Sequence, residues 1–528
     1  MSKTRNPVAW GYSEDAFTEI ERRRILPMAS AWFGRALPEA VAAPAAADIA
    51  LPASRLRIPD ALLSVVADDH AVRLLHARGR SFPDLVDLRG ETLASVPDAV
   101  AEPRDEAELL QVLSWCDARG LAVIPFGGGS SVVGGVTPEV GEGWNGVVTL
   151  SMPRMAAVLD IDVEAQSVHA QAGIFGPDLE AALKPRGLAV RHFPQSYFHS
   201  TLGGWAATRG AGHFATQFAK IEDRVQALRV VTGDGRIAET QRLPAGSVGV
   251  DPNRLWCGSE GTLGIITAAV LKLFPRPKGR EVAWVGLRSP EAALSLFSLA
   301  SERAGASLTA FELMIGESLV FVLRHVPGAA APLASAHPWH VLMEISSGRS
   351  SEDARGLIEE ILAEGIERGL VGDAVLAASM AQAEALWKLR ESMSDAQRHE
   401  GASIKHDISV PVAAIPDFIA EAWRAVTALE PRARLVAFGH MGDGNLHYNV
   451  SQPVGVEPAS FLARYREIND AVHAVVRGFN GSISAEHGIG RMKRDELIAT
   501  APPVAIDLMR RIKIAFDPAG IMNPNKVI

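Results

Sequence analysis

The sequence predicts an α+β protein built from several domains. Two patterns lead to this prediction. From about residue 95, short apolar strands alternate with amphipathic helices and end in glycine-rich loops, and between residues 280 and 430 helical stretches alternate with short strands. A chain of 528 residues is too long for a single hydrophobic core, so about two to four domains are expected.

The composition narrows the class of protein. The net charge is −9 and no long run of lysine or arginine occurs, so the chain lacks the charge pattern of a nucleic-acid-binding protein. Its two cysteines, Cys116 and Cys257, cannot build a disulfide framework or a cysteine zinc site, which favours a reducing compartment. No apolar signal segment opens the sequence, and no apolar run is long enough for a transmembrane segment. We therefore expect a cytoplasmic protein, with peripheral contact to a membrane surface left open.

Segments with proline and glycine, which interrupt helices and strands, divide the chain into four predicted regions. An Ala/Pro-rich linker at residues 40–53 and a short helix at residues 59–77 belong to the first region, and the run Phe274-Pro275-Arg276-Pro277-Lys278 ends the second. The regions are an N-terminal extension (1–90), a domain with glycine-rich loops (91–278), an α+β domain (279–438) and a C-terminal segment with two histidine-containing motifs (439–528).

The first glycine-rich loop follows a predicted helix and strand. Apolar residues recur at helical spacing in residues 105–119, Gly120 supplies a stop, and residues 121–126 read as a buried strand. Residues 127–135 follow directly, with consecutive glycines whose backbone N–H groups can approach an anion closely. A mobile glycine turn is the alternative. The loop is not a P-loop, because no Gly-Lys-Ser/Thr follows, and its spacing does not suit a dinucleotide fingerprint.

Further loops of small residues come later in the same region. They occupy residues 194–204, 208–212 and 256–265, and a hairpin is predicted over residues 225–238 between them. Loops of this kind at successive strand ends suggest one extended ligand that lies along a sheet.

These loops carry a specific resemblance. Residues 125–135, 200–204 and 258–264 resemble the FAD domain of the vanillyl-alcohol-oxidase (PCMH-type) flavoprotein superfamily, and residues 516–526 resemble the C-terminal signature of FAD-linked oxidases. The resemblance implies a PCMH-type two-subdomain FAD-binding domain, an α+β substrate cap domain and a helical C-terminal segment. It also implies that the first loop cradles the FAD diphosphate, while the later loops follow the ribityl chain and the isoalloxazine ring.

Non-covalent FAD is expected, because none of the nearby histidines (His192, His199 and His213) stands in a recognised linkage motif. The residues implied to contact FAD are Pro125, Phe126, Gly127, Gly128, Gly129, Ser130, Ser131, Gln195, Ser196, Ser200, Thr201, Gly203, Gly204, Thr208, Arg209, Gly210, Ala211, Glu260, Gly261, Thr262, Gly264, Ile265, Ile266 and Asn523.

A second chemical signal lies at residues 440–449. Two histidines, His440 and His447, flank a Gly-Asp-Gly-Asn core, and Asp443-Gly444 predicts a hairpin turn. If the turn is centred there, the two histidines stand roughly opposite each other, about 5 Å apart at Cβ, and can share a metal ion. The segment 484–490 could add a carboxylate and a third imidazole. The alternative is that these histidines are structural.

The motifs His440-Met441-Gly442-Asp443-Gly444-Asn445-Leu446-His447 and Glu486-His487-Gly488-Ile489-Gly490 resemble those of the FAD-dependent 2-hydroxyacid dehydrogenases, the group with D-lactate dehydrogenases, the glycolate oxidase flavin subunit and D-2-hydroxyglutarate dehydrogenase. The resemblance implies a divalent metal, zinc, on His440, His447 and Glu486, with His487 as general base. It also implies that Arg390 and Lys405 hold the substrate carboxylate and that Asn449 contacts the substrate. In this chemistry the metal polarises the C2 hydroxyl, His487 takes its proton and hydride passes to flavin N5.

The first half of the chain also resembles a different family. Residues 10–17 and 203–212 resemble alkyl-dihydroxyacetone-phosphate synthase, a flavoenzyme without net redox change. That family has a run of histidines where this chain reads Ser484-Ala485-Glu486-His487, and an arginine where this chain has Glu312. The synthase is therefore the alternative function, and the dehydrogenase is preferred because function resides in the site.

A third hypothesis is an inactive flavin-binding module, which the complete set of site residues argues against. We expect a small hydroxyacid as substrate and a homo-oligomer as the assembly. The sequence leaves open which hydroxyacid is used, and whether a quinone, an electron-transfer flavoprotein, a cytochrome or oxygen accepts the electrons.

Overall fold

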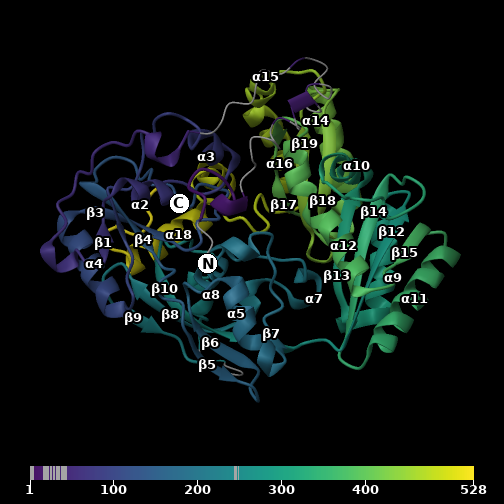
Figure 1. Ribbon diagram of the computed structural model, residues 1–528, viewed down its shortest axis with the longest axis horizontal. Helices are drawn as coiled ribbons and strands as arrows, with labels where there is room; N and C mark the ends of the chain where they lie inside the picture. Colours follow the sequence, from purple (N-terminus) through teal and green to yellow (C-terminus); the bar gives the residue numbers. More distant parts are fainter. Residues whose placement is uncertain are drawn as a thin grey trace.

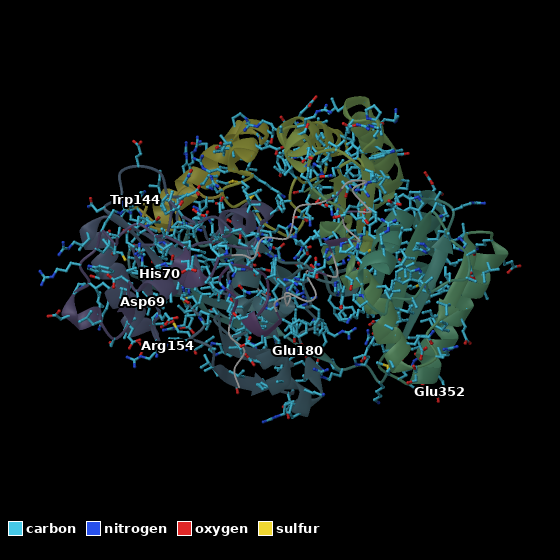
Figure 2. All side chains as sticks on the ribbon, turned by 45° about the horizontal axis from the view of Figure 1, so that its top comes forward. Asp69, His70, Trp144, Arg154, Glu180 and Glu352 are labelled. Carbon is cyan, nitrogen blue, oxygen red and sulfur yellow. The ribbon has the colours of Figure 1, made fainter. Side chains whose placement is uncertain are left out.

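The computed structural model describes residues 5–15, 44–242, 247 and 249–528, together with positions 23, 26–27, 30 and 36. Residues 40–43 of the predicted linker lie outside the described part of the chain. Two bodies lie side by side in Figure 1, one built on strands β1–β11 and the other on β12–β19. In Figure 2, Trp144 and His70 mark the first body, and Glu352 lies at the far end of the second.

The first body contains a mainly parallel sheet of four strands in the order β1-β2-β4-β3. Its strands are β1 (Val66–Ala67), β2 (Ala99–Ala101), β3 (Leu121–Phe126) and β4 (Gly146–Ser151), and the helices are α2 (His70–Leu75), α3 (Phe82–Asp87) and α4 (Glu106–Arg119). Asp105 caps α4 by accepting the Glu108 N–H, and Gly120 ends it with a φ of 62°. The predicted helix and strand before the glycine loop are therefore confirmed.

A second sheet in this body is antiparallel, with the order β5-β6-β10-β8-β9. Its strands are β5 (Val158–Asp162), β6 (Ser167–Gln171), β8 (Val225–Thr232), β9 (Ile237–Glu239) and β10 (Gly264–Lys272), and the short strands β7 (Leu188–Ala189) and β11 (Phe274–Pro275) pair separately. The associated helices are α5 (Gly176–Leu183), α6 (Leu202–Thr208), α7 (Ala215–Phe218) and α8 (Asn253–Trp256). The pairing of β8 with β9 confirms the hairpin predicted over residues 225–238.

The second body is one sheet in the order β15-β12-β14-β13-β18-β19-β16, with β17 also paired to β19. Its strands are β12 (Gly279–Leu287), β13 (Leu308–Ile315), β14 (Trp339–Ser347), β15 (Val371–Leu376), β16 (Ser403–Ile404), β17 (Asp407–Ser409), β18 (Arg434–His440) and β19 (Asn445–Ser451). The hairpin of β18 and β19 completes this sheet, so strand pairing crosses the boundary predicted at residues 438/439.

Helices cover both faces of this sheet. On one face the core contains residues of α9 (Pro290–Ala304), α11 (Ser351–Glu367), α14 (Ile415–Leu429) and α16 (Tyr465–Gly478). On the other face it contains residues of α10 (Gly316–His325), α12 (Met380–Glu391) and α13 (Met393–Arg398). Because side chains alternate along a strand, Phe438, His440 and His447 lie on this second face together with their cross-strand partners.

The end of the chain returns to the first body. After α15 (Pro458–Leu462) and α16, the chain forms α17 (Arg494–Thr500) and α18 (Pro503–Phe516), and Figure 1 shows α18 beside β4 and β10. Met522 then forms a bridge with Val123 of β3, and Ile521 and Met522 are buried in the core of the first body.

Three predicted helices differ in the structure. Residues 59–77 form a 3-10 turn, β1 and α2 rather than one helix. Residues 380–398 and 460–476, whose sequences each predict a single helix, are divided in two, at Ser392 and between Leu462 and Tyr465. In the described part of the chain, no helix combines the length and the apolar character needed to cross a membrane.

Candidate active site

The hairpin of β18 and β19 places its two histidines differently from the prediction. His447 lies opposite Phe438, and His440 pairs instead with Glu312 on β13. The reason is the turn: Met441–Asp443 form a 3-10 turn and Gly444 follows with a φ of 77°, so the connection is longer than a two-residue turn centred on Asp443-Gly444. The imidazole centroids of His440 and His447 are nevertheless only 6.4 Å apart.

Glu312 holds His440 and Arg390 in place. Its Oε1 lies 2.6 Å from Nδ1 of His440, and its Oε2 accepts hydrogen bonds from Nε of Arg390 at 2.8 Å. Glu312 has no exposed surface. Burial alone would lower the pKa of His440, but the Glu312 carboxylate raises it to about 9. Among the described residues no hydrogen bond engages Nε2 of His440, so that nitrogen stays available to a ligand.

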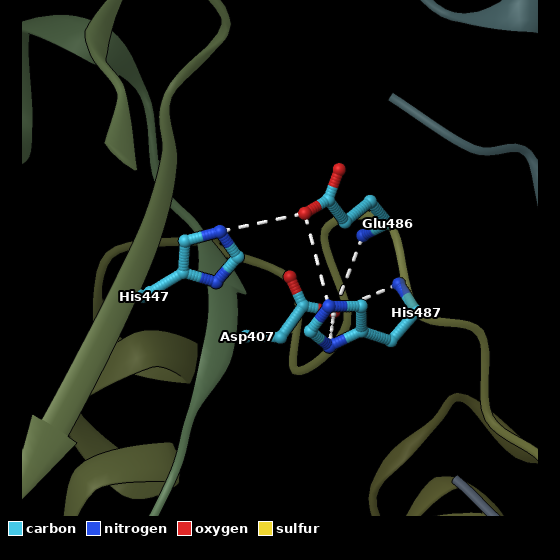
Figure 3. Close-up of side chains that lie close together, drawn as sticks. All are labelled: Asp407, His447, Glu486 and His487. Carbon is cyan, nitrogen blue, oxygen red and sulfur yellow. Dashed lines mark hydrogen bonds and ion pairs between the residues drawn. The ribbon is translucent and has the colours of Figure 1, made fainter. Parts of the chain in front are cut away.

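Asp407 organises the segment that carries Glu486 and His487. Its Oδ2 accepts the backbone N–H of Glu486 at 3.2 Å and that of His487 at 2.9 Å, and it lies 3.3 Å from Nδ1 of the His487 ring. Figure 3 shows this carboxylate beside the His487 ring. Burial would raise the pKa of Asp407, but the charges of His487, Lys493 and His447 lower it well below the ordinary range.

Four side chains meet closely enough to hold one cation. One ligand atom from each of Asp407, His447, Glu486 and His487 lies within 4.8 Å of the others, and Nε2 of His447 is 3.4 Å from Oε1 of Glu486. Oδ1 of Asp407 is buried and has no hydrogen-bond partner among the described residues. Imidazole and carboxylate donors are a set that Zn²⁺ accepts, so these residues fit a divalent metal. His447 and Glu486 of the predicted ligand set lie in this group, whereas His440 does not.

The predicted substrate residues lie on the same side of the sheet. The pairing of Ile404 with Val450 and of Asp407 with His447 puts Lys405 opposite Asn449, so both point to the face that carries His447. Asn449 donates from Nδ2 to Gln397 at 2.9 Å, which fixes its amide. Lys405 is exposed, while partial desolvation by the surrounding protein and the charge of Arg398 lower its pKa to about 8.

Arg390 differs from its predicted role in one respect. Its Nε and Nη2 both lie 2.8 Å from Oε2 of Glu312, and its guanidinium stacks 4.7 Å from the Phe438 ring centroid. The edge of the guanidinium formed by Nε and Nη2 is therefore paired with Glu312 inside the protein. The sequence could not reveal this pairing, because Glu312 lies 78 positions away.

The glycine loop after β3 fits a phosphate group. The backbone N–H groups of Gly128, Gly129 and Ser130 donate no hydrogen bond among the described residues. Backbone N–H groups that are shielded from water need an acceptor, and a bound phosphate would provide one. Gly128 passes so close to the backbone of His199 that a Cβ would lie 1.8 Å from its carbonyl oxygen. Gly129 has a φ of 63°, and a Cβ there would meet the Phe126 ring. The loop therefore requires glycine and exposes a row of unpaired donors.

The structure brings the other predicted cofactor segments to this loop. A Cβ on Gly127 would lie 2.3 Å from Oγ1 of Thr201, and one on Gly261 would lie 2.7 Å from Cγ of Pro125. Asn523 donates from Nδ2 to the carbonyls of Gly135 and Glu260. Four segments that are far apart in the sequence thus meet at the end of β3, as an extended cofactor requires.

Glu260 connects this cofactor region to the reactive segment. Its Oε1 accepts the Ile489 N–H at 2.6 Å and its Oε2 accepts the Gly490 N–H at 2.9 Å. Burial raises the pKa of Glu260 to about 7. Arg209, another predicted cofactor residue, donates to the Cys257 carbonyl and pairs with Glu222, so its guanidinium is engaged within the protein.

Two residues of the site were missed as site residues by sequence reasoning. Asp407 stands between His406 and Ile408 without a motif of its own, and Glu312 entered only as a departure from the synthase pattern. A signal was present for Glu312, because a carboxylate inside an otherwise apolar strand is rarely buried without a partner.

The comparisons with known proteins agree with this geometry. Residues 97–241 match the family described as "FAD binding domain", and residues 276–527 match "FAD linked oxidases, C-terminal domain". The two matched regions contain the glycine loop and the cluster around Asp407, respectively.

Curated relatives match most of the chain. A D-2-hydroxyglutarate dehydrogenase from Xanthomonas citri pv. viticola is 35% identical over 432 residues, covering 82% of this chain and 89% of the relative. The mitochondrial D-2-hydroxyglutarate dehydrogenase of Arabidopsis thaliana is 31% identical, covering 81% and 74%, and that of Rattus norvegicus is 33% identical, covering 83% and 79%.

Solved structures share the fold. An alkyldihydroxyacetonephosphate synthase aligns with a TM-score of 0.71 at 22% identity, covering 91% of this chain and 88% of that chain. A substrate-bound p-cresol methylhydroxylase aligns with a TM-score of 0.65 at 14% identity, covering 88% and 95%. At these identities the likeness shows the fold alone, and it confirms the predicted PCMH-type α+β architecture.

Proposed function

The chain belongs to the FAD-linked oxidase family that includes the D-2-hydroxyglutarate dehydrogenases, and on that premise we propose that it oxidises a 2-hydroxyacid to the 2-oxoacid by the side chains gathered around Asp407. The observation that carries this proposal is the contact of the Asp407–His487 pair with the His447–Glu486 pair. A base beside cation ligands is what removal of a proton from an alcohol requires.

His487 is the proposed general base. Its Nδ1 faces Asp407, and its Nε2, which lies 3.8 Å from Oε1 of Glu486, would accept the proton of the C2 hydroxyl. The His487 side chain is 35% exposed, whereas the His447 side chain is only 11% exposed, so His487 is the imidazole that substrate can reach. Asp407 fixes the ring and stabilises the imidazolium that forms, as a carboxylate does in other acid–base pairs.

The proposed metal ligands are His447 and Glu486, with His440 as the predicted third and Asp407 as the carboxylate that the structure adds. A divalent cation held there would polarise the hydroxyl of the substrate and lower its pKa. Glu312 supports this role of His440, because the bond to Nδ1 leaves Nε2 for a ligand.

Lys405 is the proposed partner of the substrate carboxylate. It is exposed on the face of β19 that carries His447, and the nearby charge of Arg398 makes an anion favourable at this place. Asn449, fixed by Gln397, would orient the substrate. Arg390 acts mainly by holding Glu312, and FAD, when bound, supplies the two-electron acceptor.

The test is anaerobic titration of the flavin with a panel of D- and L-2-hydroxyacids that includes 2-hydroxyglutarate, lactate and glycolate. Loss of the yellow colour with one of them supports the proposal. No bleaching with any hydroxyacid, together with exchange of an acyl group for a fatty alcohol on dihydroxyacetone phosphate, would favour the synthase reaction instead.

A further inference from the structure

The segment of residues 5–12 packs onto the glycine loop of the first body. Arg5 and Tyr12 form an antiparallel β-bridge through their backbones, and the Asn6 N–H donates to the Gly11 carbonyl, so the segment is a small closed turn. Both matched family regions begin later, at residues 97 and 276. The turn therefore lies outside both matched regions.

Contacts on two sides hold the turn in place. On one side Arg80, which is buried, donates from Nη2 to the Asn6 carbonyl at 2.8 Å and from its backbone N–H to the Ser131 carbonyl at 2.6 Å. On the other side the Tyr12 hydroxyl donates to the Phe198 carbonyl, and the Tyr12 and His199 rings lie 5.1 Å apart. The turn is thus held between Arg80 and the loop of residues 194–204.

Arg5 is brought directly against the loop. Its guanidinium carbon lies 5.2 Å from the Phe126 ring centroid, and a Cβ on Gly129 would lie 2.3 Å from its Nη2. Gly129 is the centre of the three residues whose N–H groups have no partner. A cation and a row of unpaired donors therefore lie next to each other.

No carboxylate balances this charge. In the described part of the chain, no acidic side chain forms an ion pair with Arg5, and the strongest effect of a neighbouring charge on it comes from the like charge of Arg80. Burial, followed by Arg80, lowers the pKa of Arg5 to about 9. Two like charges at a half-buried position are unfavourable unless an anion joins them.

We propose that Arg5 binds the diphosphate of FAD and that the turn of residues 5–12 is a part of the cofactor site. The diphosphate would supply the negative partner that is missing beside the guanidinium and the unpaired N–H groups of the loop. Arginine suits a diphosphate because its donors are planar and paired. This role requires only that the protein binds FAD, and it does not depend on which hydroxyacid is the substrate.

The test measures FAD affinity of the full chain after the flavin has been removed, by titrating FAD into the apoprotein and following flavin fluorescence. We expect Arg5→Met, which keeps the stacking on Phe126 but removes the charge, to weaken FAD binding about tenfold or more. Arg5→Lys should fall between Arg5→Met and the wild type. Arg57→Ala, at an exposed arginine, is the matched control and should bind FAD normally.

Two results would overturn the proposal. The first is an Arg5→Met variant that binds FAD as tightly as the wild type. The second comes from competition with ADP and adenosine: an equal loss of affinity for both would mean that Arg5 does not contact the diphosphate. If Arg5→Met lowers the unfolding temperature of the apoprotein, Arg5→Lys and Arg5→Met are compared in the same competition. Lysine keeps the positive charge and methionine does not, so equal affinity of the two variants for ADP would still overturn the proposal.

Discussion

Oδ2 of Asp407 lies 3.3 Å from Nδ1 of His487 and also accepts the His487 backbone N–H at 2.9 Å. One carboxylate oxygen therefore sets both the position of the segment and the orientation of the ring. Because Oδ1 of Asp407 is buried without a partner among the described residues, the same side chain can face a cation. The proposed reaction depends on both roles of Asp407, the orientation of His487 and the contact with the cation.

Replacement of Asp407 by Asn should lower kcat by about 10²-fold or more, because an amide cannot stabilise the imidazolium of His487. Bound FAD and overall fold should be retained. Steady-state kinetics, with flavin content measured by absorbance, provide the check. A matched control is Asp417→Asn, at an exposed aspartate of α14. Wild-type kcat in Asp407→Asn would contradict the role of this carboxylate.

The metal ligands can be separated from the base by elemental analysis. His447→Ala and Glu486→Gln should each lose bound divalent metal, while His487→Ala should keep it and lose turnover, because an imidazole acting as base is not required as a ligand. His169→Ala, a half-buried histidine on β6, should keep both. Loss of metal in His487→Ala would assign His487 as a ligand, and turnover that survives a chelator would remove the metal from the reaction.

The pH profile should report the charge of Lys405. Its pKa is lowered to about 8, and the ammonium is charged only below that pH. KM for the hydroxyacid should therefore rise as the pH increases through about 8. In Lys405→Arg the guanidinium stays charged, so the rise should move to higher pH. An unchanged alkaline limb in Lys405→Met would show that another group is responsible.

Glu312 should be important for stability as well as for the site. Glu312→Gln leaves the buried Arg390 and His440 without their carboxylate, and removal of one partner from a buried ion pair costs about 3 kcal/mol or more. A clear drop in the thermal unfolding midpoint is expected. Glu384→Gln, at an exposed position on α12, should leave the midpoint unchanged. An equally stable Glu312→Gln protein would contradict the importance of this buried pair.

The sequence predicted the elements whose formation depends on interactions between neighbouring residues. The helix of residues 106–119 has an N-cap at Asp105, an apolar face and a glycine stop, and the β8–β9 hairpin has a short turn between apolar strands. The glycine loop followed from residue type, because only glycine permits its close contact with His199. Each of these features is complete within a few neighbouring residues.

Relations between distant strands were not visible in the sequence. The partner of His440 depends on how β13 and β18 pair, and Glu312 lies 128 positions from His440. The hairpin turn was misjudged because a 3-10 turn before Gly444 lengthens the connection. Residues 5–12 were assigned only to the N-terminal extension, because their contact with the glycine loop joins positions more than 100 residues apart in the chain.

The most direct measurement of the central claim is anaerobic reduction of the flavin in His487→Ala, compared with the wild type and with His169→Ala. We predict that a reactive 2-hydroxyacid bleaches the flavin in the wild type and in His169→Ala, while His487→Ala retains FAD and stays yellow on that timescale. Bleaching of the His487→Ala flavin at the wild-type rate would contradict the assignment of His487 as the base.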